Sequence, residues 1–243
     1  MAKKKKTSEN KDVKRVRTLF VLGLVLIVGA VVGYGLLYST GVTDKISTAG
    51  GYSEGTHYDL IEDAETRRDG APVTVTEYFS YGCIHCKNFE PLIRDFKRTL
   101  PAGAELEQVP VTFNASWSLL ARAHLALASI DGLATNHDRL FGAIHDSRRQ
   151  FTSAEQIADF VAGKDGVTRE AFLSAFNAPN VRRKLAKIDA TMRTAQLTSV
   201  PSLVVDGRYR INMSDVSRPQ ALKVARFLVE RELAGTGTDA ATQ

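Results

Sequence analysis

Gly82-Cys83-Ile84-His85-Cys86 contains both cysteines of this 243-residue chain, and the interpretation of the whole sequence depends on this motif. It follows an apolar, strand-like run and precedes a run with helical spacing. At a strand-to-helix junction the first sulfur lies at a helix N-terminus, where unpaired backbone N–H groups and the helix dipole favour a thiolate. The second cysteine lies about one turn further along, close enough to form a disulfide. By itself, the motif fits either redox chemistry or half of a metal site.

The histidines do not supply the ligands that a metal site would still need. Zinc takes four protein ligands in structural sites and three in catalytic sites. The histidines outside the motif form no recognisable ligand pair with the two cysteines: His57, His124, His137 and His145. We therefore predict no metal. Because the chain has no other cysteine, disulfide chemistry within it must use Cys83 and Cys86.

The excess of basic residues is confined to the N-terminus. The formal net charge is +5, but residues 1–18 hold eight Lys and Arg against two acidic residues. Residues 19–243 hold 24 basic and 25 acidic residues, so the folded part has no net attraction for phosphate backbones. We therefore predict that the protein does not bind nucleic acid. The hydrophobic content of 44% is sufficient for one sizeable core.

An uncharged, apolar segment follows the basic tail. Its centre, 19–37, spans about 28 Å as a helix, close to the thickness of the hydrocarbon core of a bilayer. A cleaved signal peptide is the alternative, but its apolar region is usually shorter and ends in a small-x-small site, which 33–38 does not provide. We predict a basic cytoplasmic tail over 1–18, a transmembrane anchor over 19–38 and a flexible linker over 39–56. The positive-inside rule then places the C-terminal domain outside the cytoplasm.

The folded domain is predicted over 57–234. Alternating and β-branched residues predict strands, the last two joined by a hairpin, over 58–61, 73–79, 105–111, 202–205 and 208–211. Helical spacing follows the motif, with a kink expected at Pro91. Further helices are predicted over 116–130, 135–146, 153–163, 168–176, 179–197 and 216–234. A disordered tail is expected over 235–243.

Two segments of this domain resemble the DsbA family of extracytoplasmic thiol–disulfide oxidoreductases. One is Glu77-Tyr78-Phe79-Ser80-Tyr81-Gly82-Cys83-Ile84-His85-Cys86 with Phe89-Glu90, and the other is Val200-Pro201-Ser202-Leu203-Val204-Val205-Asp206-Gly207-Arg208-Tyr209. The resemblance covers roughly 57–234 and implies an α/β, thioredoxin-like fold with a helical subdomain inserted at about 116–197. Together with the predicted anchor, it implies a single-pass protein of the bacterial inner membrane whose catalytic domain lies in the periplasm.

The resemblance also implies the roles of the site residues. Cys83 matches the cysteine that substrate thiols attack and Cys86 matches its buried partner, so the redox group is their disulfide and no separate cofactor is expected. Pro201 matches a proline that is cis and lies beside the cysteines. Ile84, Val200 and Pro201 are expected to contact the substrate, and a valine before the cis proline resembles the oxidase form.

His85 and Glu77 are the candidates for tuning the cysteine pair. His85 is expected to add positive charge or hydrogen-bond donors, and an exposed loop histidine is the alternative. Glu77 falls on the apolar side of its strand, where a carboxylate is costly unless it is paired or protonated. The resemblance implies a buried acid that exchanges protons near Cys86; an exposed edge residue is the alternative. The lysine often paired with this acid in the family falls near Gln108 here, so the charged partner is missing. Glu90 matches another family acid or lies on a solvated helix face.

The implied function is the introduction of disulfides into reduced, cysteine-containing exported proteins, with re-oxidation by a membrane quinone reductase of the DsbB type. A substrate thiolate attacks Cys83 and releases Cys86, and a second substrate thiol then displaces Cys83 as a thiolate. Two alternatives remain at the level of sequence. One is a reductase or isomerase kept reduced by a membrane electron donor. The other is a tethered, chaperone-like binding module whose cysteines are incidental.

Overall fold

The computed structural model describes residue 22, residues 51–62, residue 64, residues 67–68 and residues 70–239. The chain divides into two compact units, 1–51 and 52–243, and the second contains the cysteine motif. Apart from Leu22 and residues 51–56, the predicted tail, anchor and linker lie outside the described residues. None of the helices in the described part is at once long and apolar enough to cross a membrane.

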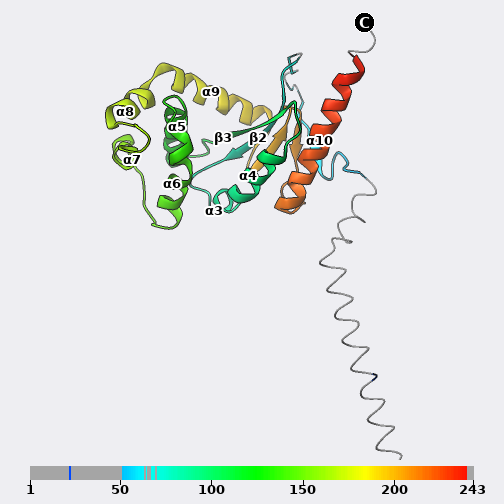
Figure 1. The fold of residues 1–243 in the computed structure, drawn as a ribbon, viewed down its shortest axis with the longest axis horizontal. Helices are drawn as coiled ribbons and strands as arrows, with labels where there is room; N and C mark the ends of the chain where they lie inside the picture. Colours follow the sequence, from blue (N-terminus) through cyan, green and yellow to red (C-terminus); the bar gives the residue numbers. More distant parts are fainter. Residues whose placement is uncertain (1–21, 23–50, 63, 65–66, 69, 240–243) are drawn as a thin grey trace, which may run out of the picture. The chain divides into compact units, whose positions relative to one another are not determined.

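A five-stranded sheet forms the centre of the domain (Figure 1). Its strands are β1 (Tyr58–Leu60), β2 (Val73–Phe79), β3 (Ala104–Pro110), β4 (Ser202–Val205) and β5 (Tyr209–Ile211). They lie in the order β1-β5-β4-β2-β3, with β2 and β3 parallel and the other neighbours antiparallel. β2 lies between β4 and β3 and is therefore an interior strand. Only three residues separate its end from Cys83, so the motif directly follows an interior strand.

The hairpin between β4 and β5 forms where the sequence predicts it. Asp206 and Gly207 have φ values of 54° and 65°, and a two-residue hairpin turn that matches strand twist needs positive φ at both positions. Glycine adopts this conformation without steric cost and aspartate tolerates it better than most residues. The Arg208 N–H donates to Val205 O and closes this turn, and Val205 then pairs with Tyr209, one residue beyond the turn.

Helices cover both faces of the sheet and one of its ends. α3 (Ile84–Lys87) and α4 (Glu90–Thr99) follow the motif, and α10 (Arg218–Asp239) follows β5. Between β3 and β4 lie α5 (Ala115–Ala128), α6 (Leu133–His145), α7 (Ala154–Val161), α8 (Arg169–Asn177) and α9 (Pro179–Thr194). In Figure 1, α5 to α8 group together at the end of the sheet away from α10. The element order confirms the predicted α/β architecture with an inserted helical subdomain.

Three apolar clusters hold these layers together. Alternation along β2 directs Val75 to one face, where α4 and α10 cover the sheet, with Leu228 of α10 fully buried there. Tyr78 points to the other face and packs, together with Val204, against the C-terminal end of α9. The core of the helical subdomain extends to Phe79 and to both cysteines. The cysteine motif thus lies where the sheet and the helical subdomain meet.

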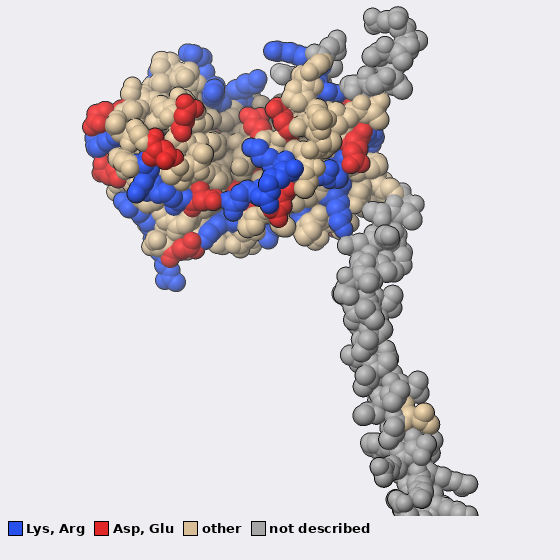
Figure 2. Space-filling model, viewed as in Figure 1, with Lys and Arg blue, Asp and Glu red and all other residues tan. Residues whose placement is uncertain are grey.

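Ion pairs on the surface also link the two parts. Arg94 of α4 pairs with Asp138 of α6, and Lys87 of α3 pairs with Asp146 after α6. Exposed pairs of this kind usually contribute no more than about 1 kcal/mol. Figure 2 shows basic and acidic side chains interspersed over the face drawn, in keeping with their near-equal numbers in residues 19–243.

The helix after the motif differs from the prediction of one kinked helix at Pro91. α3 ends at Lys87, and Pro91 lies in the first turn of a separate helix, α4. In that position the proline lacks only an N–H that would have no partner within the helix, so it breaks nothing.

Both ends of the domain extend further than predicted. Tyr52 belongs to the folded unit because its ring packs edge-on against His57 and Phe227, with ring centroids 5.1 and 5.4 Å apart, which corrects the predicted linker for 52–56. α10 continues to Asp239, which corrects the predicted disorder for 235–239. A helix that is already formed can continue through a glycine at a cost of about 1 kcal/mol.

Candidate active site

Cys83 is the N-cap residue of α3. Its backbone is extended, with φ −102° and ψ 113°, and the chain becomes helical immediately after it. As a result, the backbone N–H groups of His85 and Cys86 in the first turn lie close to its sulfur and favour its thiolate. Cys83 remains 8% exposed, whereas Cys86, inside the helix, is fully buried. The first cysteine is therefore the one that a substrate can reach.

The two thiols are free in this structure and differ in acidity. A hydrogen bond from the Cys86 thiol, working against partial burial, lowers the pKa of Cys83 from 9.0 to about 6. The backbone N–H groups of Cys86 and His85 and the charge of His85 lower it further. The pKa of Cys86 is raised far above its usual value, because its proton is held by Cys83 and because it is buried. At neutral pH the reduced site therefore holds a thiolate at Cys83 and a thiol at Cys86, and a stabilised thiolate is a good leaving group.

The loop before β4 approaches the cysteines from the other side. The Val200–Pro201 peptide bond is cis, as the resemblance implied. Cys83 Sγ lies 3.6 Å from Val200 O and donates to it while protonated. Ile84, next to Cys83, is 43% exposed. The structure therefore brings Ile84, Val200 and Pro201 together around the attacked sulfur.

His85 lies on the surface of α3 and has a partner that the sequence did not indicate. Arg218, 133 positions later at the start of α10, has a guanidinium nitrogen 3.1 Å from His85 Nδ1 and donates to it while the ring is neutral. Two basic side chains thus lie next to each other beside the motif. Nothing in the spacing of these residues predicts the contact, because it depends on how α10 packs against the sheet.

Gly82 has a packing role that the sequence also left unassigned. A Cβ atom at this position would lie 2.5 Å from Nε1 of Trp117, which is closer than real Cβ contacts. Trp117 belongs to the first turns of α5, and its ring stacks on Phe113 with centroids 5.8 Å apart. Phe113 is 38% exposed. An aromatic pair therefore lies directly beside the motif, and the glycine allows its close approach.

Glu77 is fully buried in β2, which excludes the alternative of an exposed edge residue. Its neighbour in the parallel pairing with β3 is Gln108. The Gln108 amide nitrogen donates to Glu77 Oε2 and to Glu90 Oε1, over 2.8 Å in each case. Glu77 Oε1 is buried without a hydrogen-bond partner among the described residues. Burial, followed by the charge of Glu90, raises the pKa of Glu77 well above its usual value and favours the protonated acid.

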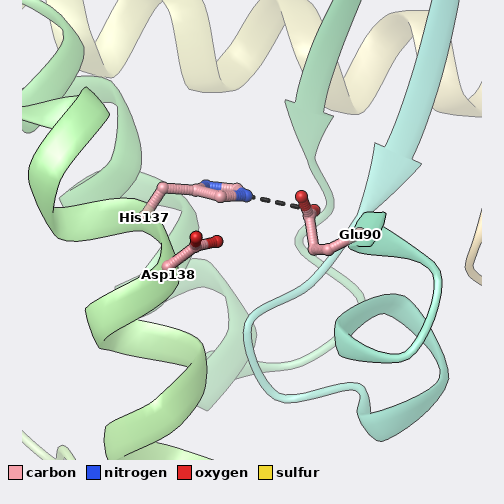
Figure 3. A group of neighbouring side chains, drawn as sticks. All are labelled: Glu90, His137 and Asp138. Atoms are coloured by element: carbon pink, nitrogen blue, oxygen red, sulfur yellow. Dashed lines mark ion pairs between the residues drawn. The ribbon is translucent and has the colours of Figure 1, made fainter. Parts of the chain in front are cut away.

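Glu90 is also buried, at 3% exposure, which excludes the solvated helix face. Its Oε1 lies 3.0 Å from Nε2 of His137, an ion-pair distance with an orientation outside hydrogen-bond geometry. Figure 3 shows the two side chains pointing toward each other, His137 from α6 and Glu90 from the start of α4. The acids below the cysteines are therefore connected to the helical subdomain.

Tyr81, two residues before Cys83, is where three of the five histidines meet. Its hydroxyl lies 3.0 Å from His124 Nδ1 and 2.9 Å from His137 Nδ1, and His145 Nε2 donates to its carbonyl oxygen over 2.9 Å. Burial, with a smaller contribution from His137, lowers the pKa of His124 to about 3, so this ring is neutral. These contacts position the loop that leads into the motif.

Glu90, His137 and Asp138 include residue types that also occur at metal sites, with one side-chain atom of each within 4.8 Å of the others. Their contacts favour an ion-pair cluster instead. Both oxygens of Asp138 accept from one nitrogen of Arg94, at 2.7 and 2.6 Å, and Glu90 Oε1 accepts from Gln108. A permanent cation already lies in the place where a metal ion would have to compete.

Comparisons with known proteins agree with this geometry. A family model described as thioredoxin matches residues 68–222. The thiol:disulfide interchange protein DsbA of Pseudomonas aeruginosa is 33% identical over 184 residues, covering 75% of this chain and 87% of that protein. The protein of the same name from Azotobacter vinelandii is 29% identical over 208 residues, covering 85% and 97%.

A solved structure gives the same result. The crystal structure of Pseudomonas aeruginosa DsbA superposes with a TM-score of 0.72 and 32% identity, over 78% of this chain and 98% of that one. Fold, sequence and the family model agree, and the residues 68–222 that the family model matches include the cysteine motif. The chain therefore belongs to the DsbA family and is a thiol–disulfide oxidoreductase.

Proposed function

We propose that this oxidoreductase works as an oxidase, which introduces disulfides into reduced, cysteine-containing proteins exported to the periplasm. The observation that carries this proposal is the acidity of Cys83, whose pKa of about 6 makes it a stable thiolate when the site is reduced. Stabilising the reduced form makes a disulfide a stronger oxidant, because the enzyme gives up its own disulfide more readily. The redox group is the cysteine pair itself, with no separate cofactor.

The reaction transfers one disulfide from the enzyme to the substrate. A substrate thiolate attacks Sγ of Cys83 in the Cys83–Cys86 disulfide, the S–S bond breaks, and Cys86 leaves and takes up a proton. A second substrate thiolate then attacks the substrate sulfur of the mixed disulfide, and Cys83 leaves as a thiolate. The substrate loses two electrons and the enzyme gains two. At this step Cys83 is bonded to the substrate, and burial, which also raises the pKa of Cys86, favours the thiol form of the departed group over the thiolate that would compete with the second substrate thiol.

The surroundings of Cys83 fit an extended polypeptide. Ile84 offers exposed apolar surface on one side of the sulfur. On the other side lies the backbone of the cis Val200–Pro201 segment, whose Val200 carbonyl oxygen is 3.6 Å from Cys83 Sγ. We assign these three residues to substrate contact, and we assign the tuning of Cys83 to His85.

The cellular arrangement is part of the same proposal. Residues 19–38 anchor the chain in the bacterial inner membrane, the basic tail stays in the cytoplasm, and the catalytic domain lies in the periplasm. Re-oxidation of the cysteine pair requires an electron acceptor, and a membrane quinone reductase of the DsbB type fits a tethered enzyme. If the anchor is present, the full chain should stay in the membrane during carbonate extraction. Its domain should be digested by protease added to intact spheroplasts, because it lies outside the cytoplasm. Release by carbonate, or protection from the protease, would contradict this arrangement.

The reduction potential tests the direction of the reaction. Equilibration with glutathione buffers should give a value well above the roughly −270 mV of thioredoxin. A value near that of thioredoxin would support the reductase or isomerase instead. Cys83→Ser should abolish oxidation of a reduced test protein, and full activity of this variant in cells would support a binding module whose cysteines are incidental.

Ile84→Ser provides a matched test of the substrate surface. Because Ile84 is exposed, its replacement should leave stability within about 0.5 kcal/mol of the parent. The KM for a cysteine-containing peptide should rise, with the pKa of Cys83 unchanged. An unchanged KM would remove Ile84 from the substrate surface.

A further inference from the structure

Two buried acids, Glu77 and Glu90, lie near the cysteine motif, and the residue between them, Gln108, is not basic. Glu77 and Glu90 are 0% and 3% exposed, and the amide of Gln108 bridges them. An amide donates hydrogen bonds but carries no charge, so it cannot offset a second carboxylate in a poorly solvated site. The pair therefore needs a positive charge from elsewhere whenever both acids are ionised.

His137 is the group in position to supply that charge. Its Nε2 lies 3.0 Å from Glu90 Oε1. The nearby guanidinium of Arg94 is bound to both oxygens of Asp138. The charged and titratable groups that face His137 from the elements around it are Glu90 of α4, Tyr81 of the loop after β2, His124 of α5, and Asp138 of α6 with its partner Arg94.

Tyr81 and His124 allow His137 to be either neutral or protonated. When His137 is neutral with its proton on Nε2, its Nδ1 accepts from the Tyr81 hydroxyl, which accepts in turn from His124 Nδ1. When His137 is protonated, its Nδ1–H donates to the Tyr81 oxygen and the hydroxyl turns to donate to His124 Nδ1. In each state the Tyr81 hydroxyl donates to one ring and accepts from the other, with the His124 proton on Nδ1 in the first state and on Nε2 in the second. The Tyr81 hydroxyl therefore keeps both of its ring contacts when His137 takes up a proton.

We infer that His137 is the titratable counter-charge of the Glu77–Glu90 pair, in place of a basic residue at position 108, and that it thereby controls the proton affinity of the acid serving Cys86. This inference rests on the proposed exchange reaction at Cys83 and Cys86. When Cys86 leaves the disulfide as a thiolate, Glu77 donates its proton to the sulfur and becomes a carboxylate. A proton from solvent that binds to His137, which is 12% exposed, balances the new negative charge until Glu77 is reprotonated. Gln108 only holds the two carboxylates and carries no proton between them. His137 acts through Glu90 and is a positioning residue.

The experiment combines His137→Asn, which removes the proposed counter-charge, with Gln108→Lys, which supplies a cation at position 108. The shorter amide of asparagine can still reach the Tyr81 hydroxyl, as Nδ1 of His137 does, but it loses the contact of Nε2 with Glu90. The variant therefore keeps a contact that supports folding and removes the positive charge beside Glu90. His57→Gln is the control, because its ring contacts Ser53 in the segment before β1. The protonation of the two acids is followed by NMR of ¹³C-carboxyl-labelled glutamate in the reduced full chain. The rate at which a cysteine peptide reduces the Cys83–Cys86 disulfide is measured over the same pH range.

Loss of the cation should raise the macroscopic pKa values of the coupled acids by about one pH unit in His137→Asn, and the rate profile should move in the same direction. Gln108→Lys should lower these values, and His137→Asn added to Gln108→Lys should then shift them by less than about 0.3 pH unit. His137→Gln, which also cannot be protonated, should reproduce the effect if the asparagine variant does not fold.

An acid titration that moves no more than in His57→Gln, or that moves equally with and without Lys at position 108, would overturn the inference. Failure of the proposed function is a separate result, since the unmodified chain would then not react with the peptide at any pH while the NMR titration remained measurable.

Discussion

Replacing Cys86 with alanine removes the interaction that contributes most to the acidity of Cys83. The fall from 9.0 to about 6 corresponds to about 4 kcal/mol at 1.36 kcal/mol per pH unit, an upper bound because solvent screens a sulfur that is only partly buried. A hydrogen bond to a charged group contributes about 1.5–3 kcal/mol. The titration midpoint of Cys83 should therefore rise by about one to two pH units in Cys86→Ala, to between about 7 and about 8.

The assay is free of interference because the chain has two cysteines, so Cys83 is the only thiol left in the variant. Thiolate absorbance in the far ultraviolet, recorded against pH, gives its midpoint directly. Cys86→Ser is the matched control, since a serine hydroxyl still donates to the thiolate and should hold the midpoint within about half a pH unit of the parent.

Two results would refute the reasoning. A midpoint that stays near 6 in Cys86→Ala would mean that the backbone N–H groups of α3 alone determine the acidity. A midpoint at 9.0 would mean that these N–H groups contribute nothing.

Three further predictions follow from contacts around the motif. Gly82→Ala should lower the free energy of unfolding in urea by about 1–3 kcal/mol, because the new Cβ would lie 2.5 Å from Trp117. The control Gly142→Ala has its nearest contact at 3.5 Å and lies inside α6, so it should be neutral or stabilising. Equal effects of the two substitutions would contradict the packing role of Gly82. Glu77→Gln should stabilise the protein increasingly as the pH rises above 4.5, because the folded-state pKa of Glu77 is raised, so the contribution of this acid is present at low pH and is lost as the pH rises through the folded-state value. A pH-independent difference in the free energy of unfolding would argue against burial of a protonated acid. The reduced protein should gain stability relative to the oxidised protein as the pH rises from about 6 toward 9.0, and lose it as the pH falls through about 6, because the folded-state pKa of Cys83 is depressed. Urea unfolding of both forms across this range tests the prediction. A difference in free energy of unfolding that does not change with pH would contradict it.

Much of the fold follows from patterns that are local in the sequence. The alternation over Val73–Phe79 predicts β2 with its observed bounds, because period-two patterning separates Val73 and Val75, which pack on one face, from Tyr78, which packs on the other. Asp206-Gly207 predicts the hairpin because few residue pairs accept positive φ at both positions. The boundaries at Pro91, at Tyr52 and after residue 234 were predicted less well. Each depends on where a neighbouring element packs or ends rather than on the residues at the boundary.

The candidate site divides in the same way. The sequence by itself determined the cysteine pair and its place between a strand and a helix, because these lie in one short motif. The family resemblance implied the cis proline, and the folded structure decided that Glu77 is buried rather than exposed at an edge. Only the tertiary structure decided which groups surround them. Cys83 and Val200 are 117 positions apart, His85 and Arg218 are 133 apart, and Tyr81 and His124 are 43 apart. Contacts over such separations depend on how the helical subdomain and α10 dock on the sheet. No local pattern of hydrophobicity or charge specifies that docking, so the partner of the acid pair, His137, became visible only in the folded chain.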